Sequence, residues 1–175
     1  MNEVLKAIES RRSVRKFKPD LPAKESIDAV VQAGLQAASG KNEQAAMVLV
    51  VTDKALRDEI SRDNCAIGGW QEGFDPFYGA PAILIVLGRK DFPTYLYDGS
   101  LMLGNMMLAA HSLGLANIWI HRAKEEFETE KYQNLLKQHG IEGEWEGIGH
   151  LALGFAAGDL PQAHPIKEGR VFYLS

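Results

Sequence analysis

One stretch of the chain constrains its fold more than any other, because no Asp, Glu, Lys or Arg occurs between Asp98 and Arg122. An uncharged run of this kind approaches the roughly 20 residues that span a bilayer. The run nevertheless contains several glycines and amides, and Gly114 stands where a helix would end. We therefore expect a buried helix over about 101–113 and a buried strand near 116–120, and no membrane span.

The rest of the chain alternates between the apolar periodicities of helices and of strands. Spacings of three and four residues predict amphipathic helices, and short runs rich in Val, Ile and Leu predict buried strands. A glycine- and proline-rich stretch predicts an irregular, lid-like loop, and Asp53 is placed to cap a short helix. The expected helices lie around 4–10, 23–39, 53–61 and 127–139, the strands at 47–52, 82–88 and 148–156, and the loop at 62–81. The alternating order predicts an α+β fold.

Composition narrows the functional classes. With 175 residues and 46% hydrophobic composition, the chain can bury one substantial core, so we expect a single domain over 1–175. A net charge of -4 gives no general attraction to nucleic acid or to acidic lipid. The one cysteine, Cys65, and the start without a basic-then-apolar signal segment favour the cytoplasm. No hydrolase motif and no metal-spaced His or Cys pair is present, so we expect no metal.

A basic run from Ser10 to Lys18 is the first candidate for a binding site in this acidic chain. Guanidinium groups and a serine hydroxyl suit a phosphate, because they donate charge-assisted hydrogen bonds in a fixed geometry. A solvated basic face at the end of a helix is the other interpretation, and on the residues alone it is somewhat favoured. Nucleic-acid binding is the weakest interpretation, since no wider basic surface accompanies the run.

Two further segments carry small or amide residues near predicted element ends. The segment 38–44 offers backbone amides and Asn and Gln side chains, which match the donors and acceptors on the edge of a heterocycle. The segment 98–100 leads into a helix in which Gly104 permits close approach of another element. A plain helix stop at 39–40 and a plain core helix after 100 are the alternative interpretations.

Taken together, these segments resemble the FMN-dependent nitroreductase family, in order and over nearly the whole chain. The landmarks are Arg11–Phe17 (RRSVRKF), Ala38–Gln44 (ASGKNEQ), Ala80–Val86 (APAILIV) and Asn105–Leu115 (NMMLAAHSLGL), the last leading into Ile118–Ile120. The resemblance implies a three-layer α+β sandwich with a central mixed sheet flanked by helices. It also implies a homodimer with FMN at the subunit interface.

The resemblance implies roles for particular residues. One group would hold the flavin phosphate and pyrimidine edge, a second would approach the same flavin from the other subunit, and a third would line the ring face, where a backbone N–H near His121 or Arg122 would serve flavin N5. A tail cation would be the last phosphate contact. These groups are, in turn, Arg11, Arg12, Ser13 and Arg15; Ser39, Gly40, Asn42 and Gln44; Trp119, Ile120, His121 and Arg122; and Lys167 or Arg170.

The chain departs from the family pattern in two places. Ala38 stands where the family usually has Pro, and Ala45-Ala46 stand where it usually has Pro-Trp. The shape of this loop is therefore not carried over. The tail offers two cations, Lys167 and Arg170, in place of one clearly placed arginine.

The resemblance implies an oxidoreductase in which NADH or NADPH reduces the flavin, leaves, and is replaced by a nitroaromatic, quinone or flavin acceptor. No catalytic side chain is required, because the flavin itself carries hydride. A non-catalytic FMN-storage protein, a flavin-fragmenting relative and a flavin-free module that docks an acidic partner are the alternatives. Of the histidines in apolar surroundings, His111 and His150 are expected to be hydrogen-bonded core residues, whereas His121 is expected beside the ring.

Overall fold

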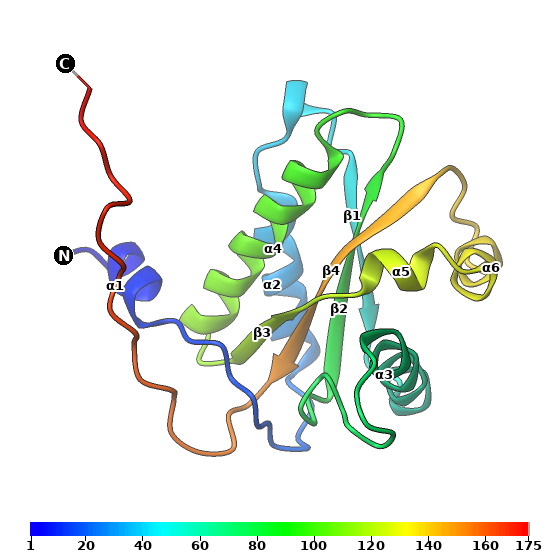
Figure 1. The fold of residues 1–175 in the computed structure, drawn as a ribbon, viewed down its shortest axis with the longest axis horizontal. Helices are drawn as coiled ribbons and strands as arrows, with labels where there is room; N and C mark the ends of the chain where they lie inside the picture. The colour runs from blue at the N-terminus through cyan, green and yellow to red at the C-terminus, as the bar shows by residue number, and fades with distance from the viewer. Residues whose placement is uncertain (175) are drawn as a thin grey trace.

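The computed structural model describes residues 1–174 and places a four-stranded sheet between two layers of helices (Figure 1). The strands are β1 (Ala46–Val51), β2 (Ala82–Arg89), β3 (Ala116–Ile120) and β4 (Trp145–Gly154). The helices are α1 (Glu3–Ser10), α2 (Lys24–Leu35), the 3-10 turn η1 (Gly40–Asn42), α3 (Lys54–Gly68), α4 (Tyr95–Ser112), α5 (Ala123–Phe127) and α6 (Glu130–Gln138).

The strands lie in the order β1-β2-β4-β3, and all three pairs are antiparallel. Within the described residues, the parallel component of the expected mixed sheet is the isolated bridge between Ser13 and Asn117. The α+β class expected from the sequence is confirmed.

The central strand β2 explains why the molecule has three layers. Its residues from Ala82 to Leu87 are fully buried, so both faces of the strand need an apolar cover. Alternate side chains point to opposite faces of a strand. Ala82, Leu84 and Val86 pack with α2 and α4, whereas Ile83, Ile85 and Leu87 pack with α3, α5 and α6. The helices in Figure 1 are grouped in the same way.

Helix ends follow local chemistry where a cap is present. Asn2 and Asp53 accept backbone N–H bonds in the first turns of α1 and α3, from Leu5 at 3.0 Å and Leu56 at 2.8 Å. The predicted cap at Asp53 is confirmed, although its helix has 15 residues and is not short. Gly69 ends α3 in the left-handed conformation, with φ 68°.

Several expected boundaries were wrong. Helix α2 ends at Leu35 and not near 39, and β4 covers Trp145–Gly154 and not 148–156. Residues 62–68 belong to α3, so the irregular loop covers 69–81. The central helix α4 begins at Tyr95, well before 101. The expected helix around 127–139 is α6, which begins only at Glu130, and Phe127 ends the separate helix α5. The chain leaves helical geometry at Thr129, whose hydroxyl donates to the carbonyl of Glu126 at 2.7 Å.

The two ends of the chain lie on one side of the molecule (Figure 1). There the end of α1 contacts α4 through Ser10 and His111. The tail residues 158–174 are exposed throughout, and α1 buries none of its residues. Among residues 1–174, no helix combines the length and the hydropathy that crossing a membrane requires.

Candidate functional site

The basic segment is fixed along the edge of the sheet. Val14 N–H donates to the carbonyl of Asn117 at 3.1 Å, and Lys18 N–H donates to the carbonyl of Phe155 at 2.8 Å. The side chains of Val14 and Phe17 are buried in the core. The arginines of this segment are therefore carried by a backbone that β3 and the end of β4 hold in place.

A pocket of about 230 Å³ lies beside this segment. Its wall combines one residue of the basic segment, the end of β3 and the loop after α3. The lining residues are Arg15, Trp70, Phe74, Pro76, Tyr78, Ile118, Trp119, Ile120, His121 and Arg122. The structure thus brings together Arg15 and all four residues predicted at 119–122. The volume lies below the roughly 300 to 1,000 Å³ of typical ligand pockets, so one chain encloses only part of a large ligand.

The aromatic side of this pocket was missed at the level of sequence. Trp70 and Phe74 lie with ring centroids 5.6 Å apart, and Phe74 and Tyr78 lie 5.9 Å apart in an edge-to-face pair. Trp70 and Phe74 are 44% and 40% exposed, which leaves large apolar faces open at the pocket. The signal in the sequence that could have indicated this wall is the spacing of Trp70, Phe74 and Tyr78, four residues apart in a Gly- and Pro-rich stretch.

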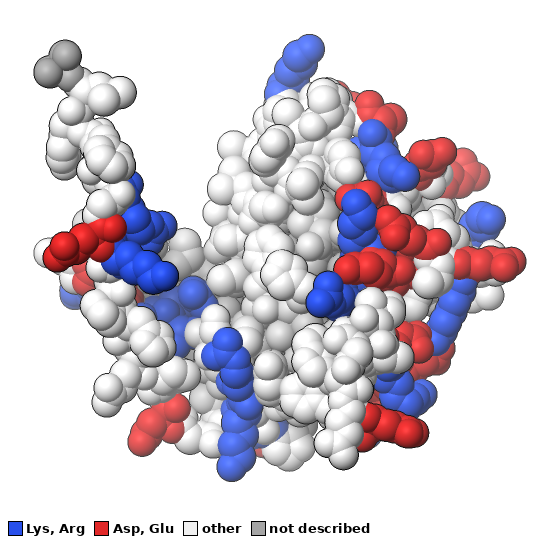
Figure 2. All heavy atoms as spheres, viewed as in Figure 1, with Lys and Arg blue, Asp and Glu red and all other residues white. Residues whose placement is uncertain are grey.

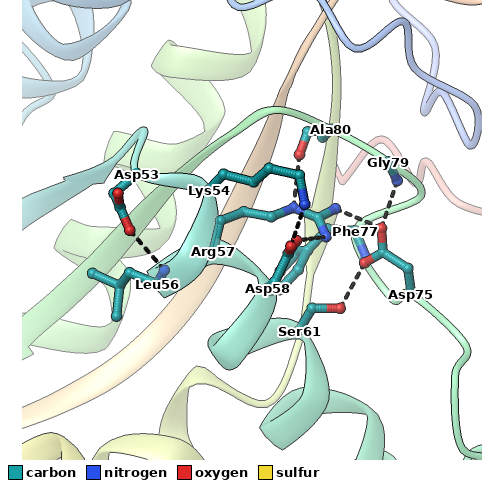
Figure 3. Close-up of polar contacts among 10 residues, drawn as sticks. All are labelled: Asp53, Lys54, Leu56, Arg57, Asp58, Ser61, Asp75, Phe77, Gly79 and Ala80. Carbon is teal, nitrogen blue, oxygen red and sulfur yellow. Dashed lines mark hydrogen bonds and ion pairs between the residues drawn. The ribbon is translucent and has the colours of Figure 1, made fainter.

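An ion pair between buried Arg57 and half-buried Asp75 anchors the loop that carries these aromatics to α3 (Figure 3). Asp75 accepts hydrogen bonds from Arg57 at 2.5 Å, from the hydroxyl of Ser61 at 2.7 Å, and from the backbone N–H groups of Phe77 and Gly79. Burial of Asp75 opposes its ionisation, but the hydrogen bonds from Arg57 and Ser61 outweigh burial and hold its pKa below the ordinary value. The carboxylate of Asp75 therefore fixes the path of the 69–81 loop.

Several buried donors around the site have no partner within residues 1–174. They are Nη1 of Arg11, Nε1 of Trp119 and Nε of Arg122. Burial, followed by the positive charge of Arg12, lowers the pKa of Arg11. Unpaired buried donors and an uncompensated cation are costly, and an anionic ligand with acceptor oxygens would relieve both. The residues present thus fit a phosphate-bearing ligand.

Arg12 behaves differently from its neighbours. Its Nη1 donates to the carbonyls of Glu9 and Arg11, at 2.6 and 2.8 Å, and so caps the end of α1. Part of its donor capacity is therefore used within the chain. Ser13, the other predicted residue of this segment, is half-buried and lies next to Asn117 at the start of β3.

The second and fourth predicted groups lie outside this pocket in the same chain. Gly40 N–H donates to Asp98 at the start of α4, and the turn it belongs to precedes β1, the strand at the opposite edge of the sheet from β3. This turn has left-handed backbone at Asn42 and Gln44, with φ 56° and 52°. Ser39, Gly40, Asn42 and Gln44 therefore do not reach the pocket of their own chain, and Lys167 and Arg170 lie in the exposed tail.

The three histidines fall into different environments. The prediction for His150 is confirmed, since the ring is fully buried and hydrogen-bonded. His111 is only half-buried, with Nε2 at 2.7 Å from the hydroxyl of Ser10, because the face of α4 that carries it meets the end of α1. Burial and the charges of Arg11 and Arg12 lower the pKa of His111. His121 lines the pocket, as the sequence predicts.

Comparisons with known proteins agree with the fold class. Residues 8–67 match the family model described as "Nitroreductase family". The structure is similar to a nitroreductase with bound FMN from Bacteroides fragilis, with a TM-score of 0.91, 26% identity and full coverage of both chains. It is also similar to a nitroreductase with bound FMN from Desulfitobacterium hafniense, with a TM-score of 0.88, 30% identity and full coverage of both chains. The chain belongs to the nitroreductase family.

A curated relative adds a second line of similarity. The chain is 30% identical over 129 residues to the NADPH-flavin oxidoreductase of Vibrio harveyi, which covers 69% of this chain and 54% of that protein. Across four curated relatives, the matched share of the relative's length runs from 53% to 68%.

The loop anchor at Asp75 yields the first prediction. We expect Asp75→Asn to lower the free energy of unfolding by about 1–3 kcal/mol, because the buried guanidinium of Arg57 loses its charged partner. Asp58→Asn is the matched control, since Asp58 also contacts Arg57, at 3.2 Å, but its hydrogen bonds are to Lys54 and Arg57 on α3 and not to the 69–81 loop. Its cost is expected to stay below about 1 kcal/mol. Denaturant unfolding followed by tryptophan fluorescence measures both.

The pH dependence of the same variants has a definite sign. Because folding lowers the pKa of Asp75, its stabilisation is fully present above the ordinary value of 3.8 and is lost as pH falls through the lower folded value. Asp75→Asn removes this loss, so its stability should fall less steeply than that of the wild type below about pH 4. Identical acid profiles for the two proteins would contradict the anchor.

Proposed function

We propose that this chain binds FMN at the pocket beside β3 and is an oxidoreductase that passes reducing equivalents from NAD(P)H to a small acceptor. The observation that carries the proposal is the convergence of Arg15, the 119–122 segment and an open aromatic wall on one pocket in a protein of this family. FMN-bound relatives and a relative named as an NADPH-flavin oxidoreductase support it. When bound, FMN would supply hydride transfer in two separate half-reactions, with a nitroaromatic, quinone or flavin as acceptor.

The chain's own residues would bind and orient the cofactor. Arg11 and Arg15 supply positive charge next to the hydroxyl of Ser13, a combination suited to a phosphate and to the electron-rich edge of a flavin. The unpaired donors of Trp119 and Arg122 would find acceptors on the ligand. The tail cations Lys167 and Arg170 would complete the contacts to the phosphate.

The aromatic wall would exclude water and select flat substrates. Trp70 and Phe74 expose ring faces at the pocket, and planar rings pack favourably on such faces. The ring of His121 lies at a centroid distance of 6.1 Å from that of Trp119, two residues earlier on the chain. We propose that a planar acceptor and the nicotinamide ring occupy this space in turn.

We further propose that the working form is a homodimer with FMN at the subunit interface. One chain encloses only part of a pocket, and the amide-bearing turn at 39–44 lies away from the pocket of its own chain. In a two-fold pair, this turn would reach the partner's pocket, as the family resemblance implies.

Apolar surface on one side of the molecule favours the same assembly. Figure 2 shows an uncharged surface over α4. It lies between the tail and a side of the molecule that carries charges of both signs. An eight-residue helix that buries no side chain, such as α1, is not stable alone in water and needs a covering surface. The exposed apolar residues of this side are Val4, Leu5, Ile8, Leu96, Tyr97, Leu101, Val171, Phe172, Tyr173 and Leu174.

Loss of one pocket cation tests the cofactor proposal. Arg15→Gln should raise the dissociation constant for FMN by about tenfold or more, because a charge-assisted hydrogen bond is lost. Lys18→Gln is the matched control, since Lys18 is also exposed in the same basic segment but does not line the pocket. Quenching of FMN fluorescence on titration with apoprotein measures both affinities. Equal affinities for both variants and the wild type would place the flavin elsewhere.

A charge placed on the uncharged face tests the dimer. Light scattering during gel filtration should give the wild type twice the 19.3 kDa of one chain. Leu101→Glu, at a position 47% exposed on α4, should shift the protein toward monomer, because a carboxylate would be buried without a partner. Ile67→Glu, at a position 37% exposed on α3 in the other helix layer, should leave the mass unchanged. A monomeric wild type would refute the dimer.

A further inference from the structure

Three fully buried polar side chains from three different elements meet behind the pocket wall. They are Asn64 on α3, Glu126 on α5 and His150 on β4. Asn64 Nδ2 lies 2.7 Å from Oε1 of Glu126, and His150 Nε2 lies 2.6 Å from Oε2 of the same carboxylate. Burying such groups is costly unless each is satisfied, so their presence calls for a purpose.

The contacts of these residues converge on the segment Ile120–Arg122. The carbonyl of Ile120 lies 3.3 Å from Nδ1 of His150, and Asn64 Nδ2 donates to the carbonyl of His121 at 2.8 Å. The carbonyl of Arg122 accepts from the backbone N–H of Glu126 at 3.0 Å, which is the first helical hydrogen bond of α5. Two successive carbonyls of the pocket wall are thus held by the side chains of His150 and Asn64, and the next one is held by the helix that carries Glu126.

The segment needs such support because Arg122 adopts the left-handed conformation, with φ 83°. This conformation is strained for a residue with a side chain, and it persists only where the surroundings over-determine it. The turn also starts α5, for which Arg122 is the N-terminal flanking residue. The buried contacts therefore act next to a strained residue of the pocket wall.

We propose that Asn64, Glu126 and His150 are positioning residues that aim the backbone N–H groups of His121 and Arg122 into the pocket. A peptide unit is planar, and in the trans form its N–H points opposite to its C=O. No cis peptide occurs within the described residues. Holding the carbonyls of Ile120 and His121 toward the interior turns the following two N–H groups the other way. The proposal rests on the proposed function for the ligand that receives these N–H groups.

The hydrogen bonds of the cluster also restrict where its protons lie. The two hydrogens of Asn64 Nδ2 face a carbonyl and a carboxylate oxygen, and the two ring nitrogens of His150 do the same. Every contact has one proton when a single proton lies between Nε2 of His150 and Oε2 of Glu126 and Nδ1 of His150 carries another. The cluster then has no net charge, and Nδ1 donates to the carbonyl of Ile120.

The first experiment needs no flavin. In the wild-type apoprotein, nitrogen-15 NMR of the histidine rings should show a proton on Nδ1 of His150, which donates to the carbonyl of Ile120. A ring without a proton on Nδ1 would leave this carbonyl without its donor and would overturn the proposal. Because no substitution is made, misfolding cannot obscure this result.

The second experiment compares two Asn→Ala variants. Asn64→Ala should raise hydrogen exchange at the amide of Glu126, which donates to the carbonyl of Arg122, by about tenfold or more, because the segment is released locally. Asn105→Ala is the control, since Asn105 also donates to a backbone carbonyl, that of Ala33 at 3.1 Å, but in the other helix layer. Exchange at Glu126 that rises equally in both variants would assign Asn64 a merely structural role.

The third experiment uses the flavin-loaded protein. Asn64→Ala and Glu126→Gln should shift the midpoint potential of bound FMN, whereas Asn105→Ala should leave it at the wild-type value. A midpoint potential that is unchanged in both Asn64→Ala and Glu126→Gln would overturn the proposal. A wild type that binds no FMN would instead refute the proposed function, and the exchange measurement would still decide whether the three residues position the segment.

Discussion

The pairing of residues 13–18 with the ends of β3 and β4 is the contact on which the candidate site depends. It places the basic segment beside the start of β3, and it does so with backbone hydrogen bonds at Val14 and Lys18 that leave the arginine side chains free of the sheet. Without it, the positive charge at the end of α1 would have no fixed relation to the pocket. A sheet buried on both faces supplies the rigid edge that this pairing needs.

The pocket walls are held by buried polar groups and not by regular structure. On one side, Asp75 and Arg57 fix the aromatic loop, and on the other, Glu126 and His150 support the strained turn at Arg122. Both pairs are partly or fully removed from water, where an ion pair contributes geometry more than stability. Two irregular segments of the site, the 69–81 loop and the turn at Arg122, thus have a backbone that buried contacts hold in place. A preorganised ligand site requires such support.

The sequence pattern predicted those features of the fold that depend on residues close together in the chain. The strand at 116–120 was predicted to the residue, and Asp53 and His150 have the predicted roles, because burial and capping depend on near neighbours. The end of α3 was missed because long-range contacts stabilise it, such as Lys131 with Asp63 at 2.5 Å. The pocket aromatics were missed for the same reason. A family resemblance located the basic and ring-face residues, but no local signal showed that 64, 126 and 150 meet behind them.

The central claim is that the pocket holds a redox-active flavin, and the visible absorption spectrum of the purified protein tests it most directly. Under anaerobic conditions, flavin bands should be present and should bleach when NADH or NADPH is added, and the faster of the two would identify the preferred donor. Flavin bands that do not bleach would indicate an FMN-binding protein without reductase activity. A colourless protein that takes up no added FMN would contradict the account altogether.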